Sequence, residues 1–160
     1  MDSRGSFLAA VVFLCTLNLR VAYAEPASDP CSLLTQLQVG VVLGTNVEAA
    51  HRVAPTLCEW SAPNQPNSIN AKKVVLTISN ERAFGYAKTP ITKSVKTIPA
   101  SGIGDDAVYA IMAGVTPGLG TSLYVKKVNS YFVVHVYGFP DQPKAMAMEK
   151  ALAVQACSKL

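Results

Sequence analysis

Apolar side chains recur at every second position in several short segments of the chain, as the strands of a sheet require. Between residues 74 and 79, Val, Leu and Ile alternate with Val, Thr and Ser, which predicts a half-buried strand. Cys58 and Trp60 are two positions apart and are expected on the same side of another strand, over residues 56–61. Three further strands are expected in meander order, with turns at 114–120 and at Asn129-Ser130, over Ala107–Met112, Thr121–Val128 and Tyr131–Tyr137.

A helix is predicted before the first strand. Thr35 and Gln38 have the spacing of a capping box, and Gly44 occupies a position typical of the residue that follows a helix. We therefore expect a helix that ends at Leu43. Its apolar face is expected to consist of Leu34, Leu37, Val41 and Val42.

A second helix is predicted after the last strand. The segment Gln142–Lys159 is amphipathic and rich in alanine, so it can approach a sheet closely. Between the strands, Glu81–Lys88 predicts one or two helical turns and Thr92–Ala100 predicts an irregular connection. This order of elements indicates an α+β fold: a single antiparallel sheet of about five strands, packed on one face by an N-terminal and a C-terminal helix.

The first 24 residues have the three parts of a cleavable secretory signal. A positive start at Arg4 is followed by an apolar run over residues 7–19, and Ala22-Tyr23-Ala24 supplies a small-x-small cleavage site. The apolar run is shorter than the roughly 20 residues that a membrane-spanning helix needs. We expect cleavage after Ala24, a short leader over residues 25–30 and one domain over residues 31–160. The mature protein is then periplasmic or secreted and does not span the membrane.

The composition is that of a folded globular domain. Half of the 160 residues are hydrophobic and 15% are charged, which excludes a disordered chain. The net charge of +4 is mildly basic, and Lys72-Lys73 and Lys126-Lys127 are the only lysine doublets. A nucleic-acid-binding protein normally carries a dense basic stripe, so we expect no nucleic-acid partner.

Three cysteines remain after the predicted cleavage: Cys31, Cys58 and Cys157. In an oxidising compartment one pair will tend to form a disulfide. A bridge between Cys31 and Cys58 would stabilise the fold by roughly 3–4 kcal/mol. Cys157 is then a buried thiol, or it displaces one partner of that pair.

Several spaced elements give the mature chain a family resemblance. They are Asp29-Pro30-Cys31-Ser32-Leu33-Leu34-Thr35, Leu43-Gly44, Cys58-Glu59-Trp60 and Gly102-Ile103-Gly104-Asp105-Asp106-Ala107. With these elements the chain resembles a family of small exported bacterial proteins and lipoproteins whose function is unknown. The resemblance implies a bacterial source, a Cys31–Cys58 bridge and a compact α+β domain, and it implies no activity. Unlike the lipoprotein members, this chain has no lipobox around Cys15.

The acidic pair Asp105-Asp106 is the strongest local candidate for chemistry. Paired carboxylates can bind a hard cation or share a proton. A calcium site needs six or more oxygen ligands, however, and the sequence has no acidic loop repeat. The favoured interpretation is structural: Gly102 and Gly104 form the turn, and an aspartate caps its backbone amides. No metal ligand set and no cofactor motif are predicted.

The last two predicted strands place aromatic residues on one face of the sheet. With Asn129-Ser130 as a two-residue turn, Val128 lies opposite Tyr131 and Tyr124 opposite His135. One face is then apolar, and the other carries Tyr124, Lys126, Tyr131, His135 and Tyr137. Tyrosine combines a large apolar area with a polar tip, which suits a binding surface. The alternative is that this face is half covered by the segment Glu81–Lys88.

The sequence predicts a non-catalytic protein of the cell envelope. It has no Gly-x-Ser-x-Gly motif and no zinc-ligand spacing, so we expect no enzyme. The expected partner is a small envelope-derived ligand or another protein, bound at the tyrosine face. One alternative is a small hydrolase that uses Asp105 or Asp106 with His135. Another is a structural or inhibitory module that makes contact through a sheet edge or through the helix containing Cys157.

Overall fold

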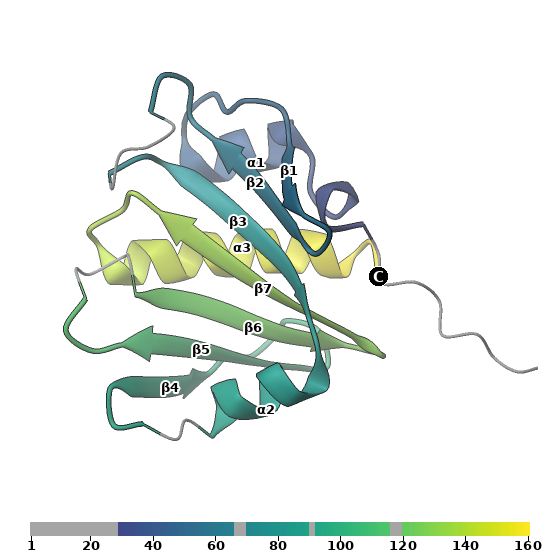
Figure 1. Cartoon of the computed structure of the whole chain (residues 1–160), viewed down its shortest axis with the longest axis vertical. Coiled ribbons are helices and arrows are strands. Elements are labelled where there is room, and N and C mark those ends of the chain that lie inside the picture. Colours follow the sequence, from purple (N-terminus) through teal and green to yellow (C-terminus); the bar gives the residue numbers. More distant parts are fainter. Residues whose placement is uncertain (1–28, 66–69, 90–91, 116–119) are drawn as a thin grey trace, which may run out of the picture.

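The protein forms a seven-stranded antiparallel sheet with helices on both faces (Figure 1). A computed structural model describes residues 29–65, 70–89, 92–115 and 120–160. The predicted signal segment and residues 25–28 of the leader lie outside the described residues. The elements in chain order are the 3-10 helix η1 (Pro30–Ser32), α1 (Gln36–Leu43), β1 (His51–Ala54), β2 (Leu57–Ser61), β3 (Lys73–Ser79), α2 (Glu81–Lys88), β4 (Val95–Pro99), β5 (Asp106–Met112), β6 (Thr121–Lys127), β7 (Ser130–Tyr137) and α3 (Gln142–Cys157).

The strand order in the sheet is β1-β2-β3-β7-β6-β5-β4. The chain builds one half of the sheet as a meander, crosses through α2 to the opposite edge, and returns strand by strand to the middle. The last strand, β7, pairs with both β3 and β6. An α+β fold with a single antiparallel sheet is therefore confirmed.

The expected number of about five strands is too low, because both edge strands were missed. β1 is short and exposed, and a bulge interrupts its pairing with β2. β4 lies within the segment 92–100 that was expected to be irregular, and it ends at Pro99. An edge strand has a neighbouring strand on one side only and is less buried than a central strand. Its sequence therefore need not show a regular alternation of apolar residues.

The main hydrophobic core lies between the sheet and the helices α1 and α3. Trp60, Leu123, Phe132 and Val134 are fully or almost fully buried on this side, which we call the core face. Helix α3 contributes Ala145, Leu152, Ala153 and Ala156 to the same core. The small alanine side chains allow α3 to lie close to β6 and β7.

Helix α1 has the predicted ends but not the predicted buried face. Thr35 caps its first turn in a capping box with Gln38, and Gly44 follows the helix with a φ of 65°. Leu37 and Val41, however, are 76% and 72% exposed. The helix contains no charged residue, so its sequence does not distinguish the face that is buried. The buried face is the one that carries Val39 and Leu43.

The expectation of helices on one face only is also wrong, because α2 packs on the opposite face. Asn80 caps the start of α2 by accepting a hydrogen bond from the backbone N–H of Ala83. Phe84 and Ala87 then form a small second core with Val108 of β5. This face of the sheet, which carries α2, is called the outer face below.

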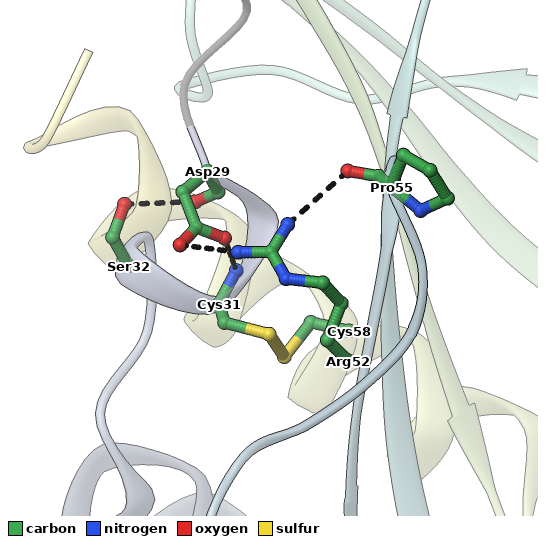
Figure 2. Close-up of polar contacts among 6 residues, drawn as sticks. All are labelled: Asp29, Cys31, Ser32, Arg52, Pro55 and Cys58. Atoms are coloured by element: carbon green, nitrogen blue, oxygen red, sulfur yellow. Dashed lines mark hydrogen bonds and ion pairs between the residues drawn. A yellow bond between two sulfur atoms is a disulfide. The ribbon is translucent and has the colours of Figure 1, made fainter.

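A disulfide ties the start of the described chain to the sheet (Figure 2). Cys31 in η1 is bonded to Cys58 in β2, as the family resemblance implied. Asp29 forms an ion pair with Arg52 of β1 and accepts a hydrogen bond from the backbone N–H of Cys31. Cys157 in α3 is the free cysteine among the described residues, and burial raises the pKa of its thiol.

No helix within the described ranges has the length and apolar character needed to cross a membrane.

Candidate functional site on the outer face of the sheet

The hairpin β6–β7 places the five predicted binding residues on the outer face. Lys127 pairs with Ser130, so the turn is formed by Val128 and Asn129 and not by Asn129 and Ser130. The true register therefore differs by two residues from the predicted one. A shift of two positions keeps every side chain on its predicted side, because side chains alternate with a period of two. The face thus carries Tyr124, Lys126, Tyr131, His135 and Tyr137.

Helix α2 covers one end of this set. The ring of Tyr131 lies 5.8 Å from the ring of Phe84, at an angle of 54°. The Nζ atom of Lys126 lies 5.8 Å from the centre of the Tyr131 ring. Tyr131 therefore supports the attachment of α2, which corresponds to the alternative that this face is half covered.

A groove runs between α2 and the strands β4, β5 and β6. Its volume is about 410 Å³, and none of its lining side chains is charged. Tyr86 and Met112 stand at its rim with exposed fractions of 49% and 55%, and Tyr124 forms part of its floor. The full lining consists of Ala83, Tyr86, Ala87, Thr92, Val95, Ala110, Met112, Ser122 and Tyr124. A largely apolar groove with a few hydroxyl groups is typical of small-molecule sites.

A polar aromatic cluster adjoins the groove at Ser122. The hydroxyl oxygen of Ser122 lies 3.2 Å from Nδ1 of His135, close enough for a hydrogen bond. The His135 ring stacks on the Tyr137 ring, with centres 3.9 Å apart and an angle of 9° between the planes. The cluster places hydrogen-bonding groups at one end of an uncharged groove.

Charges lie at the far side of this cluster. Lys73 of β3 places its Nζ atom 5.1 Å from the centre of the Tyr137 ring and 3.1 Å from Oε2 of Glu59. Burial raises the pKa of Tyr137, and the negative charges of Glu59 and Glu149 raise it further. Tyr137 is therefore a neutral phenol at ordinary pH.

The acidic pair in the glycine turn lies at the other end of the sheet. Asp106 pairs with Lys126 on β6 and forms a 2.6 Å ion pair with Lys88. Asp105 accepts a 2.5 Å hydrogen bond from the backbone N–H of Val128, and this bond is the main cause of its lowered pKa. Both carboxylates thus have partners within the protein.

Gly102 and Gly104 both have positive φ angles in this turn, 75° and 56°. At Gly104 the backbone also approaches β6, because an added Cβ would lie 2.3 Å from the carbonyl oxygen of Lys126. These glycines allow the chain to enter β5 beside the end of β6.

A buried carboxyl group behind the sheet was not predicted from the sequence. Glu149 of α3 has an exposed fraction of 0%, and burial raises its pKa to about 8. Its Oε1 atom accepts hydrogen bonds from the hydroxyl of Thr121, at 3.1 Å, and from the backbone N–H of Val136, at 3.3 Å. A signal was present, since Glu149 lies at helical spacing among the buried residues Ala145, Leu152, Ala153 and Ala156.

The groove residues Tyr86, Met112 and Ser122 were also missed as candidates. They come from three separate elements, and the register that joins them was not available from the sequence. Tyr124 is the predicted residue that lines the groove, while His135 and Tyr137 lie in the adjoining cluster.

Within the described ranges, no group of three or more His, Cys, Asp or Glu side chains has the geometry of a metal site. The chain matches no protein-family model, no curated protein and no solved structure.

Proposed function

We propose that this protein is a non-catalytic, extracytoplasmic domain that binds a small, mainly apolar ligand in the groove between α2 and the outer face. The observation that carries the proposal is the uncharged lining of the 410 Å³ groove, next to the Ser122–His135 pair. An uncharged lining favours ligands without a formal charge, because a buried ion without a partner is costly. The aromatic rim supplies a large contact area with little conformational entropy to lose.

The extracytoplasmic location is part of the proposal. It is supported by the Cys31–Cys58 disulfide, since disulfides persist mainly in oxidising compartments. It is also supported by the predicted signal segment. The resemblance to small exported bacterial proteins adds the cell envelope as the place where the ligand would be met.

The arrangement of the acidic residues does not favour the alternative of a hydrolase. Asp106 is the strand partner of Lys126 on β6. His135 is hydrogen-bonded to Ser122, which lies four positions before Lys126 on the same strand. That separation corresponds to roughly 13 Å at the usual rise per residue of a strand. A general base must come within hydrogen-bond reach of the group that it activates.

The test uses the neutral fluorescent probe N-phenylnaphthylamine, whose emission rises in apolar surroundings. In the variant Ala83→Phe, the added ring fills the groove from α2. We expect the affinity for the probe to fall by about tenfold or more, which is the usual effect of losing one contact in an apolar pocket. The control is Val53→Phe, which introduces the same side chain at an exposed position of β1 that does not line the groove. Equal probe binding by wild type and both variants, or no binding by the wild type, would refute a ligand site in the groove.

A further inference from the structure

Glu149 is the least easily explained residue of the core. Its side chain is completely buried, yet its Oε2 atom has no hydrogen-bond partner among the described residues. A buried carboxyl group with an unpaired oxygen carries a desolvation cost that no hydrogen bond offsets. Such a residue requires an explanation other than packing, since a leucine would fill the same position without this cost.

The position of Glu149 between two strands is informative. The described pairing of β6 with β7 ends at Leu123 and Val134. In the same register the next core-facing residues, Thr121 and Val136, would lie opposite each other. Both donate instead to Oε1 of Glu149. The carboxyl group thus takes the place of a strand-to-strand contact at the point where β6 and β7 separate.

The same two strand segments form the polar cluster on the outer face. Ser122 follows Thr121, and His135 precedes Val136, so the side chains joined at 3.2 Å are direct neighbours of the two groups that Glu149 holds. Glu149 on the core face and the Ser122–His135 pair on the outer face therefore fix one strand spacing from opposite sides.

We propose that Glu149 is a positioning residue whose protonation state controls the spacing of β6 and β7 beside the outer-face site. This inference rests on the ligand-binding function proposed above. In its neutral form Glu149 holds the ends of β6 and β7 together and keeps Ser122 and His135 in register beside the groove. When Glu149 loses its proton to solvent, the strand ends separate and the site loses its polar end.

The surroundings of Glu149 explain why its charge is the trigger. Burial raises the pKa of Glu149 to about 8 against the opposing effect of its two hydrogen bonds. Tyr109 of β5 lies on the same side of the sheet as Glu149, whereas Tyr137 of β7 lies on the outer face, and the Glu149 charge raises the pKa of both phenols. Thr121 of β6 does not titrate, and α1 has no ionisable side chain. A negative charge on Glu149 therefore meets no cation on these elements and must be hydrated.

The direct readout is hydrogen exchange of the backbone N–H of Val136, corrected for the intrinsic pH dependence of exchange. In the wild type, protection should fall by about tenfold or more between about pH 6 and about pH 9. In Glu149→Gln, which keeps the Oε1 acceptor but cannot titrate, protection should stay constant. The matched control Glu59→Gln removes a carboxylate beside Tyr137 and should retain the wild-type step. Protection that is independent of pH in the wild type, or the same step in Glu149→Gln, would overturn the proposed role of Glu149.

Two further measurements distinguish the proposed role of Glu149 from the proposed binding function. The affinity for N-phenylnaphthylamine should weaken with the Val136 step in the wild type and be independent of pH in Glu149→Gln. If the probe affinity is independent of pH while Val136 protection falls, the coupling between Glu149 ionisation and ligand binding is refuted, but the binding function is not. If the probe does not bind at any pH, the binding function itself is refuted. Should Glu149→Gln not fold, the carbon-13 shift of the Glu149 carboxyl in the wild type gives its titration, and a midpoint near the ordinary glutamate value would overturn the inference.

Discussion

The backbone N–H of Val128 donates a 2.5 Å hydrogen bond to Oδ2 of Asp105, which joins the β6–β7 turn to the glycine turn before β5. Val128 has a φ of 54°, in the left-handed region that β-branched residues strongly avoid. The hydrogen bond therefore stabilises a turn whose first residue is conformationally unfavourable.

Replacing Val128 by asparagine should stabilise the protein. Asparagine tolerates the left-handed region, and the Val128 side chain is 59% exposed, so little buried area is lost. We expect the free energy of unfolding to rise by about 1 kcal/mol, measured by urea denaturation. Val128→Ala keeps the unfavourable backbone conformation without the branched side chain, so it should gain less. A loss of stability in Val128→Asn would contradict the strain at this position.

Gly104 and Gly102 form a matched pair for testing the turn before β5. Both have positive φ, but only Gly104 is crowded, because its added Cβ would lie 2.3 Å from the carbonyl oxygen of Lys126. Gly102→Ala should lower the free energy of unfolding by about 1 kcal/mol through backbone strain alone. Gly104→Ala should cost at least twice as much, since a backbone atom must move. Thermal unfolding of the two variants side by side tests this, and equal losses would show that the close approach has no energetic effect.

Removal of the disulfide should strongly destabilise the domain. The double variant Cys31→Ser/Cys58→Ser frees a loop with a sequence separation of 27 residues. The chain-entropy argument gives a loss of about 3–4 kcal/mol in the free energy of unfolding. Cys157→Ser is the control, because that thiol forms no disulfide. Denaturation curves with and without a reducing agent provide the measurement: reductant should shift the wild-type curve and leave that of the double variant in place.

Stability should fall as the pH rises towards about 8. The pKa of Glu149 is raised from 4.5 to about 8 in the folded protein, so the folded state keeps a proton that the unfolded state has already lost. The stabilisation is complete below about pH 4.5 and is lost as the pH rises through the folded pKa, with a slope of up to about 1.4 kcal/mol per pH unit. Glu149→Gln should remove this slope. Denaturant midpoints at several pH values measure it, and identical slopes in both proteins would contradict the titration of Glu149.

The strands with strong internal patterns were predictable from the sequence, whereas the edges of the sheet were not. Val74 and Leu76 are buried and alternate with the half-buried Lys73, Val75 and Thr77 because β3 is buried on one face, and that periodicity predicted the strand correctly. Thr97 and Ile98 belong to β4, an edge strand whose half-buried residues follow one another without alternation. A sequence pattern records burial, so strands with little one-sided burial leave only a weak pattern.

The candidate site was predictable as a face but not as a groove. Tyr124 and His135 were assigned to the correct side even with the wrong turn, because a two-residue shift preserves the side of every strand residue. The groove depends on α2, whose packing on the outer face brings Tyr86 near Met112 and Tyr124. Such contacts between distant elements follow from tertiary packing and are not encoded in any local periodicity.

The central position of β7 determines when the fold can be completed. The strands β1 to β3 and the strands β4 to β6 form two three-stranded meanders, and within the described sheet each meander is paired with β7 and not with the other. A growing chain that has not yet reached Ser130 exposes two bare strand edges, β3 and β6, with their unpaired backbone groups. The sheet therefore becomes continuous only when β7 pairs with both β3 and β6.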